Sequence, residues 1–302
     1  MRFSIWPSPS RSWDEIHELA AHCEQTGWDA VYFADHFMPN GPGPAPLDGD
    51  ILECWSVLAA LAASVPRVRL APLVTSVTYR HPAVLAKIAA AVDQVSRGRL
   101  TLGIGAGWQE NEHAAYGIAL GTLRERMDRF EEATQILRSL LDQSRTTFSG
   151  QYFQLDDAPN QPAPVQARVP LLIGGSGERR MLRIAAQYAD HWNAWTTPEL
   201  LTHKLSVLHA HCEQVGRDPA HIHVSTQAVV FLSTDEEWLK DKREGLPRRP
   251  VIAGTPAEVA TIVARYQEAG ADELIIPDFN GSLTRAKDTC DLFMQEVAPA
   301  FR

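Results

Sequence analysis

Residues Arg99–Gly117 read Arg-Leu-Thr-Leu-Gly-Ile-Gly-Ala-Gly-Trp-Gln-Glu-Asn-Glu-His-Ala-Ala-Tyr-Gly. The first six of them alternate between polar or small residues and apolar ones, which predicts a short buried strand. Glycine then takes every second place, at Gly103, Gly105 and Gly107, and such glycines let a backbone bend or come close to a ligand. Trp108 and a run of polar side chains follow at once. The stretch therefore indicates either a strand that delivers side chains to a ligand site or a strand that ends in a flexible turn.

Composition narrows the class of protein. The 302-residue chain is 45% hydrophobic and 22% charged, which is ordinary for a globular protein. Its formal net charge of -9 argues against a general nucleic-acid binder, which needs a basic face. No apolar run is long enough to span a bilayer. The four cysteines form no Cys-x-x-Cys pair, so we expect a cytoplasmic protein with reduced cysteines.

Strand and helix patterns alternate along the whole chain. Eight strands are expected, at residues 3–6, 30–34, 68–74, 100–104, 171–173, 191–194, 221–232 and 273–277. About eight helices separate them, and capping boxes at Ser12–Glu15 and Thr255–Glu258 mark the start of two. This order predicts an α/β fold, a single-domain (β/α)₈ TIM barrel over residues 1–302. Residues 142–170 after the fourth helix and 233–254 after the seventh strand are expected to be insertions.

The alternative fold is a doubly wound open sheet, which would need a motif at a topological switch point, and none is found. In a closed barrel the active site lies at the carboxyl ends of the strands. That rule selects the residues that directly follow each predicted strand: Trp6, Asp35 and His36, Val74–Thr78, Gly105–Asn111, Gly174–Gly177, and Trp195 with Thr196.

Two of these positions carry a chemical prediction from residue type alone. Gly174-Gly-Ser-Gly177, between a strand and a helix, can offer free backbone N–H groups to a phosphate, although a plain tight turn is the alternative. His36, at a strand end, can act as an acid or base near neutral pH. The alternative is a histidine that is packed against its neighbours or solvated and has no chemical role.

The histidine pairs in the sequence do not predict a metal site. His209 and His211 point to different sides of a helix. His221 and His223 share one strand face, but no carboxylate or cysteine partner is evident near them. We therefore expect no metal site.

Several motifs together resemble the bacterial luciferase-like flavin and deazaflavin oxidoreductases. They are Asp35-His36-Phe37, Arg80–Ala86, Arg99–Gly117, Pro170–Trp195 and Gly254–Val259. The resemblance covers nearly the whole chain and implies a (β/α)₈ barrel that binds FMN or the deazaflavin coenzyme F420. The Gly-x-Gly-x-Gly-Trp pattern is more similar to the deazaflavin branch.

The resemblance also implies roles for single residues. His36 matches the histidine over the hydride-bearing ring, and Asn111 matches an asparagine that contacts the cofactor. Residues 72–75 match a bulge that backs the ring and contains a non-prolyl cis peptide, expected at Pro72–Leu73. The implied cofactor contacts are Asp35, Pro72, Leu73, Val74, Thr75, Gly105, Gly107, Asn111, Gly174, Gly175, Ser176 and Gly177. Trp6, Trp108 and Trp195 are expected to line the substrate pocket.

Two departures from the sugar-phosphate dehydrogenases of that family argue against sugar-phosphate oxidation. Those enzymes carry a glutamate acid where this chain has Trp108, and a lysine for the substrate phosphate where this chain has Pro198. Within the site, Glu110 or Glu112 is expected to orient His36. Asp35 is not, because adjacent side chains of an extended segment point to opposite faces.

The sequence therefore predicts an F420-dependent oxidoreductase that moves a hydride to or from a small organic substrate. It is expected to act as a homodimer that contacts neither nucleic acid nor membrane. An FMN-dependent monooxygenase that uses reduced flavin and oxygen is the alternative. A non-catalytic protein that only binds flavin or deazaflavin is a second alternative.

Overall fold

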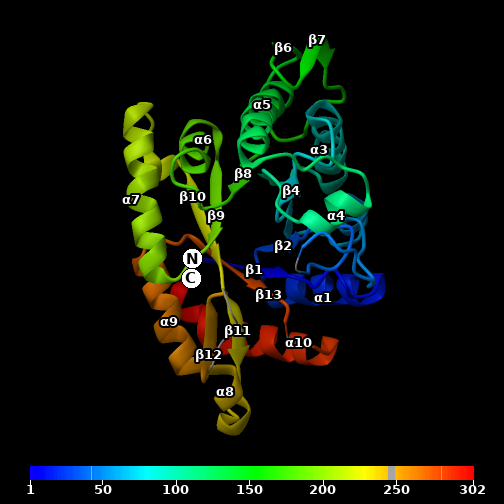
Figure 1. Ribbon diagram of the computed structural model, residues 1–302. Helices are drawn as coiled ribbons and strands as arrows, with labels where there is room; N and C mark the ends of the chain where they lie inside the picture. The colour runs from blue at the N-terminus through cyan, green and yellow to red at the C-terminus, as the bar shows by residue number, and fades with distance from the viewer. Residues whose placement is uncertain (42, 244–248, 280) are drawn as a thin grey trace.

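The computed structural model describes residues 1–41, 43–243, 249–279 and 281–302. Parallel strands form a barrel with helices around it (Figure 1). The barrel strands are β1 (Arg2–Trp6), β2 (Ala30–Phe33), β3 (Arg69–Pro72), β4 (Thr75–Ser76), β5 (Leu102–Gly105), β8 (Leu171–Gly174), β9 (His191–Trp195), β10 (His223–Gln227) and β13 (Glu273–Pro277).

The order of these strands shows that the sheet closes on itself. It runs β3-β2-β1-β13-β10-β9-β8-β5-β4, and β3 and β4 are separated by only two residues in the chain. Leu70 in β3 also forms a bridge with Leu100, just before β5. We therefore count β3 and β4 as one interrupted strand, which gives eight strands in the described part of the chain. The predicted (β/α)₈ barrel is confirmed.

The helices cover the outside of the barrel. They are α1 (Trp13–Thr26), α2 (Cys54–Ser64), α3 (Pro82–Ser96), α5 (Leu123–Asp142), α6 (Met181–Tyr188), α7 (Pro198–Gln214), α9 (Pro256–Glu268) and α10 (Leu283–Leu292), with short helical turns η1 (Pro219–His221), η2 (Phe293–Val297) and η3 (Ala298–Phe301). The predicted capping boxes at the starts of α1 and α9 are both present. No helix in the described ranges is long and apolar enough to cross a membrane.

Both predicted insertions are present, but the second begins differently from the prediction. Residues 142–170 contain a hairpin of β6 (Arg145–Ser149) and β7 (Gln154–Pro159). The continuous strand predicted over 221–232 is wrong, because β10 ends at Gln227 and β11 (Val229–Leu232) pairs with β12 (Val251–Gly254) in a separate sheet. The residues of both strands are mostly buried, and no glycine or proline separates β10 from β11, so periodicity alone does not reveal the break. Helix α8 (Glu236–Arg243) lies between β11 and β12, and residues 244–248 of this insertion lie outside the described part.

The alternating glycines make room for the interrupted strand. A Cβ atom on Gly103 would collide with the carbonyl oxygen of Pro72, and one on Gly105 would lie 2.7 Å from Val74 Cγ2. A Cβ on Gly174, in the next strand of the barrel, would lie 2.9 Å from Val74 Cγ1. The non-prolyl cis peptide joins Leu73 to Val74, one residue later than predicted. Glycine on β5 and β8 therefore allows residues 72–74 to occupy the inside of the barrel.

Candidate active site

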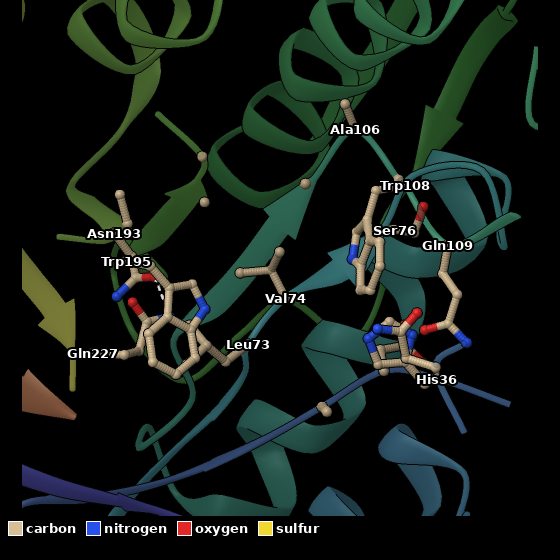
Figure 2. Close-up of a pocket in the computed structure, with 18 of the residues that line it drawn as sticks. His36, Leu73, Val74, Ser76, Ala106, Trp108, Gln109, Asn193, Trp195 and Gln227 are labelled. Atoms are coloured by element: carbon tan, nitrogen blue, oxygen red, sulfur yellow. Dashed lines mark hydrogen bonds between the residues drawn. The ribbon is translucent and has the colours of Figure 1, made fainter. Parts of the chain in front are cut away.

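A cavity of about 1510 Å³ opens at the carboxyl ends of the barrel strands. Figure 2 shows Val74 between two groups of its lining side chains, with His36, Trp108 and Gln109 on one side and Trp195, Asn193 and Gln227 on the other. Most site residues predicted from the sequence line it: Trp6, Asp35, His36, Leu73, Val74, Gly105, Gly107, Trp108, Gly174, Gly175, Ser176, Gly177 and Trp195.

The structure does not bring Pro72, Thr75 and Asn111 to the cavity wall. Asn111 is fully buried, where its Nδ2 donates to the Pro39 carbonyl at 2.9 Å and its Oδ1 accepts from the Glu112 amide. Thr75 Oγ1 accepts a hydrogen bond from the Trp55 indole at 3.0 Å. These side chains hold the loops behind the cavity, because their polar atoms are already used by the protein.

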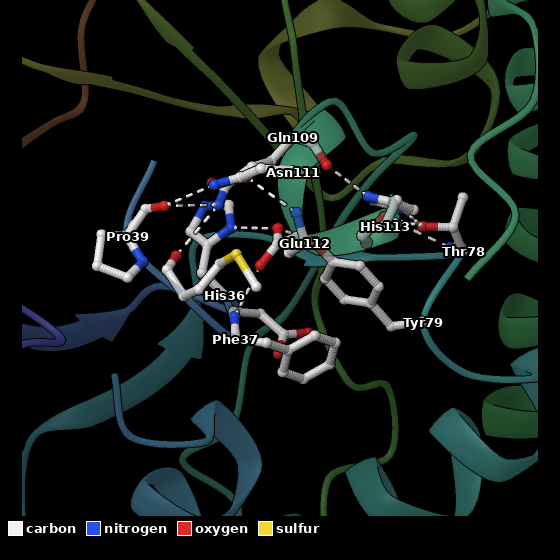
Figure 3. Close-up of polar contacts among 12 residues, drawn as sticks. His36, Phe37, Pro39, Thr78, Tyr79, Gln109, Asn111, Glu112 and His113 are labelled. Atoms are coloured by element: carbon white, nitrogen blue, oxygen red, sulfur yellow. Dashed lines mark hydrogen bonds and ion pairs between the residues drawn. The ribbon is translucent and has the colours of Figure 1, made fainter. Parts of the chain in front are cut away.

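His36 is held by a carboxylate from a distant segment of the chain. Its Nδ1 lies 2.8 Å from Glu112 Oε1, and Glu112 belongs to α4 (Glu110–Ala115), a helix the sequence analysis did not predict (Figure 3). The Phe37 amide donates to Glu112 Oε2 at 2.7 Å, and the Tyr79 hydroxyl donates to Oε1. Of the two glutamates expected to orient His36, Glu112 is the one that contacts it.

The surroundings of Glu112 keep its carboxylate charged. Burial by itself would raise the pKa of Glu112, but the hydrogen bonds from His36, Tyr79 and the Phe37 amide outweigh burial and hold that pKa below its ordinary value. An ionised Glu112 accepts a hydrogen bond from the Nδ1–H group of His36, so in the neutral form of this imidazole Nε2 carries the lone pair. Among the described residues no partner is recorded for Nε2.

As the sequence predicted, Asp35 does not contact His36 in the way that Glu112 does; its partner is Arg80. It accepts two hydrogen bonds from the Arg80 guanidinium, at 2.6 and 3.2 Å, and Arg80 also contacts Glu53 at 2.5 Å. Burial raises the pKa of Asp35 although Arg80 opposes this effect. The Asp35–Arg80 ion pair therefore connects the segment that carries His36 to the segment that precedes α3.

Trp108 forms a wall beside the histidine. Its ring meets the His36 imidazole edge to face, with centroids 5.6 Å apart and planes at 84°. The indole is 56% exposed, so one face remains free toward the mouth of the cavity. A group stacked there would cover His36 from water.

Three buried polar atoms in the cavity wall have no partner within the described residues. They are Oε1 of Gln109, Oε1 of Gln227 and Nε1 of Trp6. The amide nitrogens of the two glutamines are fixed, by the Met38 carbonyl at 3.1 Å and by Asn193 Oδ1 at 2.8 Å. Because leaving such atoms unpaired is costly, they are candidate hydrogen-bonding positions for a ligand.

The glycine loop after β8, Gly174–Gly177, is held by hydrogen bonds at Gly175. The Gly175 amide donates to the Asn193 carbonyl at 2.9 Å, and the Trp192 indole donates to the Gly175 carbonyl at 2.8 Å. Helix α6 begins only at Met181, so residues 175–180 form the connection between β8 and the helix. Arg180 is paired with Asp128 and Glu131, so its charge is largely neutralised.

A cation that the sequence analysis did not identify also lines the cavity. The Arg249 guanidinium lies 4.7 Å from the Trp195 ring centroid and 5.4 Å from that of Phe279. Burial lowers its pKa, and no carboxylate is paired with it in the described ranges. It is a candidate contact for an anionic or electron-rich group.

Comparison with known proteins identifies the family. The model of the family described as luciferase-like monooxygenase matches residues 1–249. The chain belongs to this family.

Two enzymes that are named as F420-dependent are similar to part of this chain. An F420-dependent glucose-6-phosphate dehydrogenase of Nakamurella multipartita is 32% identical over 74% of this chain and 65% of its own length. An F420-dependent hydroxymycolic acid dehydrogenase of Mycobacterium tuberculosis is 30% identical over 74% of this chain and 60% of its own. These alignments therefore cover less than two thirds of either relative.

Solved structures show the same fold. An F420-dependent secondary alcohol dehydrogenase, solved with an F420-acetone adduct, has a TM-score of 0.86 at 21% identity and covers 100% of this chain and 99% of its own. The monooxygenase RslO1 from Streptomyces bottropensis has a TM-score of 0.82 at 20% identity, with 100% of both chains covered. At these identities the likeness to the solved structures shows the barrel fold alone.

Three lining residues of this luciferase-like barrel were not predicted from the sequence: Asn193, Gln227 and Arg249. Asn193 lies near the end of the strand predicted over 191–194, where the rule for strand ends could have found it. Gln227 ends β10 but lies inside the strand predicted over 221–232, so that rule did not reach it. Gln109 lies within the stretch Gly105–Asn111, which the rule did select. Arg249 had no such signal, because it lies in an insertion.

Proposed function

We propose that this luciferase-like protein is an oxidoreductase that transfers a hydride between coenzyme F420 and a small organic substrate. The observation that carries the proposal is the His36–Glu112 pair at the wall of a cavity backed by Leu73 and Val74. The cavity volume of about 1510 Å³ exceeds that of most single-ligand sites, so a cofactor and a substrate fit together. The F420-dependent relatives support this choice of cofactor.

The residues present fit a deazaflavin. Leu73 and Val74 would back its ring, and the amides of Ser176 and Gly177, which have no recorded acceptor in the described chain, would hold its phosphate. The unpaired oxygens of Gln109 and Gln227 would accept hydrogen bonds from polar edges of the cofactor or substrate. F420, when bound, supplies the carbon that donates or accepts the hydride.

The chain itself supplies proton transfer and positioning. His36 Nε2 takes the proton from a substrate hydroxyl, or returns one in the reverse direction, while Nδ1 stays bonded to Glu112. The negative Glu112 stabilises the imidazolium that forms. Trp108 packs edge to face against His36, so a substrate stacked on its exposed ring would shield the imidazole from water.

A cofactor titration tests the proposal. Trp6, Trp108 and Trp195 line the cavity, so a bound cofactor should quench tryptophan fluorescence. We expect F420 to do so at lower concentration than FMN, and to turn over with a panel of alcohols or carbonyl compounds. Tighter binding of FMN would favour the monooxygenase alternative. F420 binding without turnover on any substrate would favour the non-catalytic one.

Replacing Ser176 by aspartate should weaken F420 binding by about tenfold or more, because a carboxylate would oppose the cofactor phosphate. The titration of S176D against wild type measures this effect. S176A is the matched control, since it removes the hydroxyl without adding charge. Unchanged affinity in S176D would remove the glycine loop from the phosphate site.

Glucose 6-phosphate should not reduce F420 in the presence of this protein. Trp108 cannot donate a carboxylic proton, and Pro198, the first residue of α7, offers no charge to a phosphate. The readout is loss of F420 absorbance, with the Nakamurella relative as the positive control. Saturable reduction at a rate close to that of the relative would show that other residues replace the missing glutamate and lysine.

We also propose that residues 1–302 form one domain that assembles as a cytoplasmic homodimer. The pairing of β1 with β13 supports a single domain, because the barrel needs both ends of the chain to close. The four cysteines are buried and unbridged, which supports a reducing compartment. Light scattering during gel filtration tests the dimer.

A further inference from the structure

A second polar cluster lies at the end of the barrel opposite the cavity. His191, His223 and Glu273 are the first residues of the neighbouring strands β9, β10 and β13. No partner for His223 is evident in the sequence, and the structure supplies two, Glu273 and Asp272. His221 lies apart from them, exposed in the turn η1.

The donor atoms of these three residues converge. His223 Nε2 lies 2.9 Å from Glu273 Oε2, and His191 Nε2 lies 4.0 Å from the same oxygen. All three donor atoms lie within 4.8 Å of one another, and the imidazole centroids are 4.5 Å apart. Ligands around a tetrahedral zinc ion lie about 3.3 Å apart, given bonds of about 2.0–2.1 Å. Small side-chain rotations would bring the set to that spacing.

Two of the three groups lie in the protein interior. His191 and Glu273 are 5% and 2% exposed, and His223 is partly exposed. A neutral imidazole and a carboxylate are the forms of these side chains that ligate a metal ion.

Neighbouring side chains hold these groups in place. Ser4 Oγ donates to Glu273 Oε1 at 2.5 Å, and the Tyr32 hydroxyl donates to Oε2 at 3.2 Å. Asp272 Oδ2 lies 3.6 Å from His223 Nδ1, on the side of the ring away from Glu273. A carboxylate behind an imidazole is the usual support of a metal-binding histidine.

We propose that His191, His223 and Glu273 bind one divalent transition-metal ion, for which zinc is the best match. Two imidazoles and one carboxylate leave a fourth position for water, and the partly exposed His223 side chain gives access from solvent. The ion would take the place of the proton between His223 and Glu273, and would compete with Ser225 Oγ, now 2.7 Å from His191 Nε2. Bound there, it ties three barrel strands together. The site is independent of the proposed reaction, because none of its residues lines the cavity.

The test is metal binding to the full chain after removal of metal by a chelator. We expect one equivalent of Zn²⁺, and Co²⁺ as a probe should give the visible absorption of a four-coordinate site. H223Q should weaken the affinity at least about tenfold, since it removes a ligand. H221Q is the matched control, because that histidine lies two residues away outside the cluster, and it should bind as wild type does.

A second readout separates metal binding from folding. Zn²⁺ should raise the Tm of wild type and H221Q in a saturable way, and should raise the Tm of H223Q less at the same concentration. H223Q is preferred to a Glu273 variant because His223 is partly exposed and its replacement leaves the core intact. Equal Zn²⁺ affinity in H223Q and wild type, or no binding by wild type, would overturn the proposal.

Discussion

Replacing His36 by alanine is expected to lower turnover at least about a hundredfold while the affinity for F420 stays within a few fold of wild type. The reason is the position of the imidazole, whose Nδ1 is committed to Glu112 and whose Nε2 has no partner in the described chain. Removing it takes away the proton carrier but none of the backbone that would hold the cofactor. A hundredfold loss lies within the range for a single acid–base group.

Steady-state turnover and a cofactor titration on the same H36A preparation measure both effects. H209A is a suitable control, because His209 is exposed on α7, away from the cavity. Wild-type turnover in H36A would remove His36 from the mechanism. Lost binding with full activity in the bound fraction would make His36 a cofactor ligand instead.

Replacing Glu112 by glutamine should lower turnover by about 10- to 100-fold, the usual cost of losing the group that orients a functional histidine. The amide can donate to Nδ1 where the carboxylate accepted from it, which favours the other tautomer and leaves Nε2 protonated. It also cannot balance the charge of an imidazolium. The expected signature is a lower kcat with KM nearly unchanged.

E110Q is the matched control for this variant, since Glu110 lies on the same helix but is exposed. Its kcat should equal that of wild type. If E112Q retains wild-type kcat, the His36–Glu112 pair has only a structural role.

Glu112 should also affect stability at low pH. Its pKa in the folded state is below the ordinary value of 4.5, so its contribution is present above that value and is lost as pH falls through the lowered pKa. Chemical denaturation of E112Q should therefore show a free energy of unfolding that depends less on pH below about 4.5 than that of wild type.

Local patterns in the sequence determined that the chain forms a barrel and that its cavity lies at the carboxyl ends of the strands. Strand and helix patterns and capping boxes depend on burial and on backbone hydrogen bonds within one segment. They can therefore be identified from the residues of that segment alone. Because a closed barrel presents its strand ends together, the positions of His36, Trp108 and Ser176 at the cavity followed from strand ends alone.

Only the tertiary structure decided which side chains meet. His36 and Glu112 are 76 residues apart and touch because the loop after β2 lies against the helix after β5. His191, His223 and Glu273 meet because β9, β10 and β13 are neighbours in a register that no single segment encodes. The end of β10 at Gln227 and the close approach of Gly103 to Pro72 also depend on contacts between segments that are distant in the sequence. A sequence pattern shows that a residue is buried or polar, but contacts between distant segments depend on how the strands close around the barrel.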